Sequence, residues 1–114
     1  MPSKGAETAL HDIQHHIDLA TAFIADISPD NLRSDLRTLY AVVRCLEIIS
    51  EASRRLPDDL KQRHSPIAWK QIASAGNIYR HDYEDITAQM IWDTVVLALP
   101  ILKVAIDAEI ARLS

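Results

Sequence analysis

The segment LRSDLRTLYAVVRCLEIISEASRRL, residues 32–56, decides the fold, because its apolar residues recur with the 3.6-residue period of an α-helix. Plotted at 100° per residue, its apolar arc covers more than half of the helix circumference, which is more than one core contact requires. The arc consists of Leu39, Val42, Val43, Leu46, Ile49, Ala52 and Leu56. Such a helix is either central in the fold or shared between two subunits.

The rest of the chain shows the same period and no convincing alternating pattern of a strand. We expect a first helix over residues 8–27, and Asp30 or Asn31 as the cap of the helix over 32–56. A short helical turn should follow up to residue 64, and a last helix should span 87–113, bent where Pro100 interrupts its hydrogen bonds. These elements predict an all-α fold, an antiparallel helical bundle of four to five helices.

The third long helix leaves one question open. Ser65 and Pro66 fit the cap and the first turn of a helix. If that helix continues, one stripe carries Trp69, Ile72, Gly76, Tyr79 and Tyr83. If Gly76 and Asn77 end it instead, residues 77–85 lie in a turn.

The chain has 114 residues, enough for one domain with a single core, which we assign to residues 1–114. Its net charge of −4 excludes a basic field over the whole surface, so nucleic-acid binding requires a local patch. The single cysteine, Cys45, is expected in the core and fits a reducing cytosol. No apolar run reaches the roughly 18 residues of a membrane span, and no signal peptide is visible. We therefore expect a cytoplasmic protein without a membrane partner.

Residues 77–85, NIYRHDYED, bring a histidine, an arginine, two tyrosines and three acidic residues together in a sequence that is otherwise rich in leucine and isoleucine. Imidazole titrates near neutral pH, so His81 can act as a general acid and a general base. Arg80 carries a guanidinium suited to a phosphate, and the Tyr83 hydroxyl can bond a phosphate or accept a modifying group. Histidine and arginine without a nucleophilic serine or cysteine fit RNA cleavage, because RNA supplies its own nucleophile, the 2′-OH. The same residues are also typical of a salt-bridged helix end that faces solvent.

Other polar groups have structural interpretations beside functional ones. His11, His15 and Glu7 share a helical face and could hold a metal, but a solvated face is the simpler interpretation, so we expect no metal and no cofactor. Trp69 and Trp92 are expected to be core anchors rather than platforms for stacked bases.

Arginines form a stripe on the polar side of the helix over 32–56. Within it, Arg37 and Arg44 could follow a phosphate backbone and contact RNA. Because Glu47 and Glu51 are interleaved with them, pairing within the helix is the competing interpretation.

Three segments resemble the HepT-like toxins of the HEPN superfamily. Residues 46–56, LEIISEASRRL, are similar to that family's second-helix signature LEIIGEAxxxL, and residues 67–73, IAWKQIA, are similar to IPWxxIA. His81 and Tyr83 match the H-x-Y element, and IWDTV at 91–95 matches the helix after it. Together, in this order, the likeness covers residues 39–102.

The resemblance implies a HEPN-like homodimer, with two copies of the motif in a cleft between the subunits. It also implies a metal-independent RNA endonuclease that works with His81 and an arginine. The implied partner is a nucleotidyltransferase antitoxin of the MNT type, which silences the toxin by transferring AMP to Tyr83.

The family motif places an arginine five to seven residues before the histidine, where this chain has Ser74, Ala75 and Gly76. Arg80 is the nearest guanidinium in the sequence, so we assign it to the phosphate. The alternative is a catalytically impaired HEPN module that binds a nucleotide or a partner protein. A third interpretation is a purely structural helical dimer.

Overall fold

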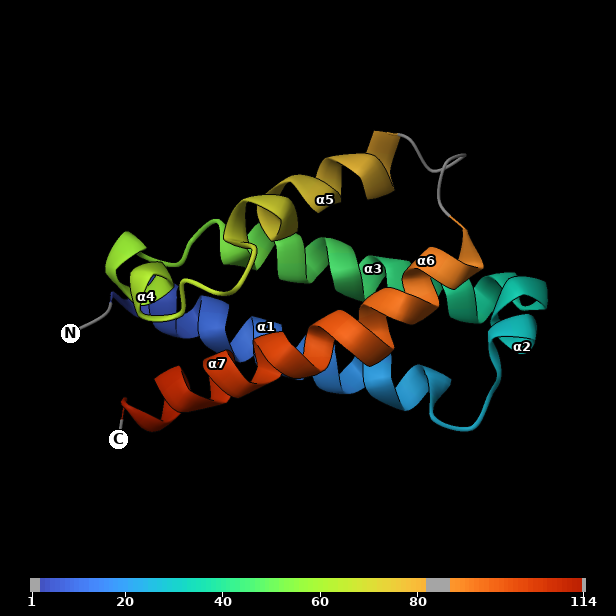
Figure 1. The fold of residues 1–114 in the computed structure, drawn as a ribbon, viewed down its shortest axis with the longest axis horizontal. Coiled ribbons are helices and arrows are strands. Elements are labelled where there is room, and N and C mark those ends of the chain that lie inside the picture. Colours follow the sequence, from blue (N-terminus) through green and yellow to red (C-terminus); the bar gives the residue numbers. More distant parts are fainter. Residues whose placement is uncertain (1–2, 82–86, 114) are drawn as a thin grey trace.

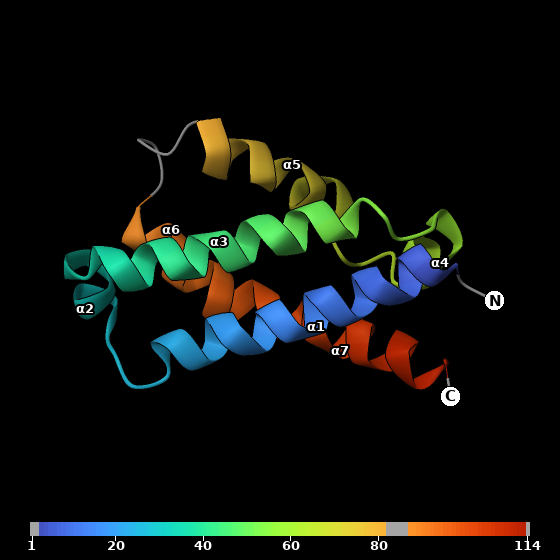
Figure 2. The ribbon, with the colours of Figure 1, turned by 180° about the vertical axis from the view of Figure 1, so that it is seen from behind.

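The computed structural model describes residues 3–81 and 87–113, and these ranges contain helices and no strand. The four longest helices are α1 (Lys4–Ile24), α3 (Leu36–Ser53), α5 (Trp69–His81) and α7 (Leu99–Ala111). Between them lie α2 (Pro29–Ser34), α4 (Asp58–Arg63), α6 (Ala88–Asp93) and the π-helical segment η2 (Thr94–Ala98). Neighbouring long helices run antiparallel (Figures 1 and 2). The predicted all-α bundle is confirmed.

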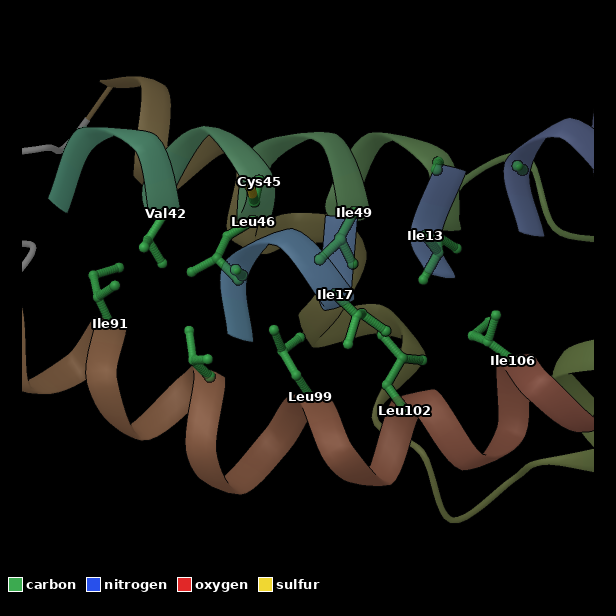
Figure 3. Packing of buried hydrophobic residues seen from close by; sticks show 14 of the residues in the cluster. Ile13, Ile17, Val42, Cys45, Leu46, Ile49, Ile91, Leu99, Leu102 and Ile106 are labelled. Carbon is green, nitrogen blue, oxygen red and sulfur yellow. The ribbon is translucent and has the colours of Figure 1, made fainter. Parts of the chain in front are cut away.

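The core lies between α3, α1 and the continuous α6–η2–α7 segment. Figure 3 shows side chains of α3 pointing across the core toward those of α6 and α7, with α1 between them. The labelled residues are Val42, Cys45, Leu46 and Ile49 of α3, Ile91 of α6, Leu99, Leu102 and Ile106 of α7, and Ile13 and Ile17 of α1. Because α3 packs against α1, α5 and α6, it is the central helix that its wide apolar arc predicts.

The first half of the chain differs from expectation at its helix ends. α1 begins at Lys4 because the Ser3 hydroxyl accepts a hydrogen bond from the Ala6 N–H at 3.1 Å. The cap prediction was wrong: Ser28 caps α2, and Asn31 completes a reciprocal capping box from inside that helix.

The predicted helix over residues 32–56 is divided between α2 and α3. Asp35 leaves the helical conformation, with φ −112° and ψ 89°. Its carboxylate accepts hydrogen bonds from the Thr38 N–H at 3.2 Å and the Thr38 hydroxyl at 2.6 Å. A local side-chain cap therefore outcompetes a continuous backbone ladder at this position.

The second half also departs from the predicted ends. Ser65 and Pro66 do not start α5, which begins at Trp69. The preceding turn is held by the Trp69 indole N–H, which donates to the carbonyls of His64 at 3.1 Å and Lys61 at 3.2 Å. Trp69 is therefore the buried anchor that the sequence predicts, and Trp92 is partly buried against the core.

Pro100 interrupts the last helix as predicted. The residue before it, Leu99, donates its N–H to the Thr94 carbonyl five residues back, so the ladder widens to a π-turn where the proline has no N–H to give. Cys45 is buried as predicted, and burial raises the pKa of its thiol. Among the described helices, none is long and apolar enough to span a bilayer.

Candidate functional site

Helix α5 carries the first part of the motif at residues 77–85. It continues through Gly76 and Asn77 to His81, so the helical alternative is confirmed for residues 77–81. Tyr83 and the side chains of Arg80 and His81 lie outside the described residues. The candidate site is therefore defined by the helix that carries these groups and by the surfaces on either side of it.

The hydroxyl of Ser50 fixes α5 against α3. Its Oγ accepts a hydrogen bond from the Gly76 N–H at 3.0 Å and donates one to the Ala73 carbonyl at 3.1 Å. A Cβ at position 76 would lie 2.8 Å from Ser50 Oγ and 3.2 Å from Ser50 Cβ. A side chain at position 76 would therefore require the Ser50 side chain or one of the two helices to shift.

This contact bears directly on the arginine that the family motif expects. Position 76 is closed by Ser50, Ala75 is half-buried, and Ser74 is exposed. None of the three positions supplies a guanidinium, so a positive charge for the motif has to come from another residue.

Arg54, the C-cap residue of α3, reinforces the same contact. Its Nε and one terminal nitrogen donate to the Ala73 carbonyl at 3.0 and 2.7 Å. These roles of Ser50 and Arg54 were not predicted from the sequence. A signal was present, since Ser50 stands where the second-helix signature has glycine, and Gly76 is one of the three positions at which the motif places its arginine.

Tyr79 connects the last turn of α5 to the other side of the molecule. It is partly buried against the core, and Thr94 of η2 lines the same apolar groove. Burial raises the pKa of Tyr79, with Thr94 acting in the opposite direction. The helix that carries the motif is thus attached to α3 near Gly76 and lies beside η2 at Tyr79.

Two grooves flank α5. An apolar groove of about 300 Å³ lies between α3, α5 and the η2–α7 segment, and its lining includes Ile72, Leu46 and Ile101. A second groove of about 580 Å³ lies along the N-terminal half of α3 and ends at Tyr79. Both grooves include Tyr79, so both reach the turn that precedes His81.

The likeness of this chain to known proteins identifies its family. Residues 13–109 match the family model described as "Ribonuclease HepT-like". This chain belongs to the HepT-like ribonuclease family. No solved structure matches it.

Two relatives illustrate how far the likeness of this HepT-like chain extends. It is 36% identical over 94 residues to a protein of Thermococcus cleftensis named "Probable ribonuclease HepT", with 82% of this chain and 86% of the relative covered. It is 33% identical over 100 residues to a Methanocaldococcus jannaschii protein provisionally named an RNase, with 88% and 83% covered. The family resemblance seen in the three sequence segments is confirmed over most of the chain.

The arginine stripe of this HepT-like protein lies on the exposed face of α3. Arg44 pairs with Glu47 at 3.1 Å, so pairing within the helix is confirmed for these two residues. Arg37, one turn earlier, is also exposed. Exposed ion pairs contribute roughly 0–1 kcal/mol, so the Arg44 guanidinium can exchange its partner for a phosphate.

The histidine face of α1 does not assemble a metal site. Across residues 3–81 and 87–113, no three His, Cys, Asp or Glu side chains are grouped as metal ligands. Glu7, His11 and His15 therefore do not form the cluster that was weighed as an alternative.

Proposed function

We propose that this protein is an RNA endonuclease that uses the substrate's own 2′-OH as the nucleophile. The observation that carries the proposal is membership of the HepT-like ribonuclease family, combined with an H-x-Y motif whose histidine, His81, is the last residue of α5. Two relatives whose names describe them as ribonucleases support it.

The chemistry needs proton transfer and charge stabilisation only. The 2′-oxygen attacks the adjacent phosphorus while His81 accepts its proton, and the bond to the 5′-oxygen breaks as His81 returns a proton to that oxygen. The products are a 2′,3′-cyclic phosphate and a 5′-hydroxyl, so no metal and no cofactor are required by the reaction. Arg80 neutralises the charge that develops on the phosphate oxygens.

The test compares wild type with His81→Ala during induced expression in a bacterial host, with growth and total RNA followed together. His11→Ala is the matched control, because His11 is an exposed histidine on a different helix. We expect growth arrest and RNA fragments with a cyclic phosphate for wild type and His11→Ala, and neither for His81→Ala. Equal toxicity of wild type and His81→Ala would refute the assignment.

We propose that the active form is a homodimer. The η2–α7 segment exposes Leu97, Ile101 and Val104, with relative accessible surfaces of 66%, 64% and 72%. These residues are four and three apart and therefore share one helical stripe. Ile101 also lines the apolar groove beside α5, so a second copy bound there would lie next to the helix that carries the motif. Sedimentation should give a dimer for wild type and a monomer for Ile101→Asp; a wild-type monomer would contradict this.

We also propose a nucleotidyltransferase antitoxin of the MNT type as partner, with Tyr83 as the site that receives AMP. Incubation with that enzyme and ATP should add the mass of AMP to wild type and not to Tyr83→Phe. Unchanged intact mass of the wild type would count against this role.

The second candidate function is a HEPN module that binds without cleaving. It is favoured by the Ser50–Gly76 contact, which leaves no room for an arginine at position 76. Purified wild type that leaves every tested RNA intact, yet binds the nucleotidyltransferase tightly, would favour this candidate over the nuclease.

A further inference from the structure

The groove along the N-terminal half of α3 is adjacent to the turn that carries the motif. Helices α3 and α5 are antiparallel, are joined by the Ser50–Gly76 hydrogen bond, and diverge toward the C-terminal end of α5 (Figures 1 and 2). The groove of about 580 Å³ is lined by the N-terminal half of α3 and by Tyr79. Tyr79, which lines the groove from α5, is two residues before His81.

The groove has an apolar floor and an aromatic rim. Leu39 and Val43 are partly buried at its base and pack against the core. Tyr40 stands at the edge with 64% of its surface exposed, although tyrosine is large and costly to leave in water. An exposed ring above an apolar floor offers a face on which another flat group can stack.

Positive charge flanks the ring on both sides. Arg37 precedes Tyr40 by three residues and Arg44 follows it by four, so all three project from one stripe of α3. Arg44 also lines the groove, where the carboxylate of Glu47 holds it at 3.1 Å. An aromatic ring between two guanidiniums, one turn away on either side, is the arrangement that proteins use for single strands of nucleic acid.

We propose that this groove binds one base of single-stranded RNA, stacked on Tyr40, with the flanking phosphates on Arg37 and Arg44. The proposal rests on the proposed nuclease function and adds how the substrate is held beside α5. The occupant is single-stranded because a base inside a duplex has no free face for Tyr40. A charged backbone also explains why arginines, rather than further apolar residues, flank the ring.

The test measures binding of the full chain to a fluorescein-labelled single-stranded RNA with 2′-O-methyl groups on every sugar. This probe has no free 2′-OH, so binding is measured whether or not the protein is a nuclease. Tyr40→Ala should weaken binding about tenfold, within the range found when a stacking aromatic is removed. Tyr40→Trp should bind like wild type, because it keeps a flat ring. The matched control is Phe23→Ala, which removes an exposed aromatic ring from another helix, α1, and should bind like wild type.

Salt dependence tests the phosphate contacts separately. Arg44→Gln should lower the slope of log affinity against log salt by about 0.7, the value for one phosphate contact on a single strand. Duplex RNA of the same sequence should bind more weakly than the single strand.

The proposal about the groove and the proposed nuclease function can be refuted independently. Unchanged binding by Tyr40→Ala would overturn the groove proposal even if wild type cleaves RNA. Tyr40-dependent binding with no cleavage would support the groove and refute the nuclease. If Tyr40→Ala instead converts a dimer to a monomer in sedimentation, the groove is a contact between copies of this chain and the RNA proposal is wrong.

Discussion

The Ser50 hydroxyl occupies the space that a side chain at Gly76 would need, and it accepts a hydrogen bond from the Gly76 N–H at 3.0 Å. Within the packed interface of α3 and α5, this contact brings the backbone of α5 close to a side chain of α3. Because α5 carries Arg80 and His81, this point sets where the motif lies relative to α3.

Substitutions at 50 and 76 should therefore depend on each other. Gly76→Ala adds a methyl group 2.8 Å from Ser50 Oγ, and overpacking of this kind costs about 1–3 kcal/mol. The better helix propensity of alanine offsets about 1 kcal/mol of that. In a Ser50→Gly background both contacting atoms are absent, so the same change should be neutral or stabilising. Urea unfolding of the four proteins gives the coupling free energy, which we expect to be about 1–2 kcal/mol.

The other glycine provides the control for this cycle. A Cβ on Gly5 of α1 would lie 3.8 Å from Ser3 Oγ, an ordinary contact. Gly5→Ala should stabilise the protein in both backgrounds by the same amount. Equal effects of Gly76→Ala with and without the Ser50 hydroxyl would show that the contact does not restrict position 76.

Arg54→Gln should loosen α5 locally. The change removes both hydrogen bonds to the Ala73 carbonyl, and each such bond contributes about 0.5–1.5 kcal/mol. Amide hydrogen exchange should accelerate in α5 and stay unchanged in α1. Arg55→Gln is the matched control, since Arg55 is the next residue and pairs with Asp12 of α1 instead. Equal exchange in α5 for the two variants would contradict the role of Arg54.

The sequence predicts the long helices well because each has an apolar face that repeats over several turns. It predicts helix ends poorly, since these depend on single hydrogen bonds: Ser3 starts α1 early, and Asp35 divides the helix expected over 32–56. Pro100 was predictable because a missing N–H interrupts any helix.

The surroundings of the motif were harder to predict than the motif itself. The histidine, arginine and tyrosine of the motif can be recognised in the sequence itself. The Ser50–Gly76 contact joins positions 26 residues apart, and it forms only when two helices pack. Tyr40 was visible only as one member of a polar stripe. The groove that it borders forms because α5 diverges from α3, which no local pattern specifies.

Glu109 forms a charged centre at the opposite end of the bundle from the motif. Its carboxylate, 5% exposed, accepts hydrogen bonds from Arg63 at 2.6 Å and is 2.8 Å from His64 Nε2. Arg112 is a second guanidinium near this carboxylate, at 3.7 Å. The hydrogen bond from Arg63 is the main reason that the pKa of Glu109 is lowered, with His64 acting in the same direction.

The protein should lose the stability that ionised Glu109 contributes when the pH is lowered. Because the pKa of Glu109 is lower in the folded state, its stabilisation is present above the unfolded pKa of about 4.3 and is lost as pH falls through the folded pKa. Glu109→Gln should lower the free energy of unfolding by about 1–3 kcal/mol at pH 7. The difference from wild type should shrink between about pH 5 and pH 3. The control is Glu51→Gln, at an exposed carboxylate, whose unfolding free energy should follow that of wild type at every pH. If the difference between Glu109→Gln and wild type is constant with pH, the contacts of Glu109 with Arg63 and His64 do not stabilise its ionised form.

Tyr79 should contribute to the pH dependence of the unfolding free energy in alkaline solution. Burial raises its pKa, so the folded state holds the neutral phenol while the unfolded chain ionises near pH 10. Its stabilisation is therefore full below about pH 10 and is lost as pH rises through the folded pKa. Tyr79→Phe should flatten the fall in unfolding free energy between about pH 9 and pH 11. It should also remove the tyrosinate transition that ultraviolet absorbance detects above the ordinary range of a phenol. Tyr40→Phe, at an exposed ring, should leave that transition in place. If Tyr40→Phe removes it and Tyr79→Phe does not, then Tyr79 is not the phenol whose pKa burial raises.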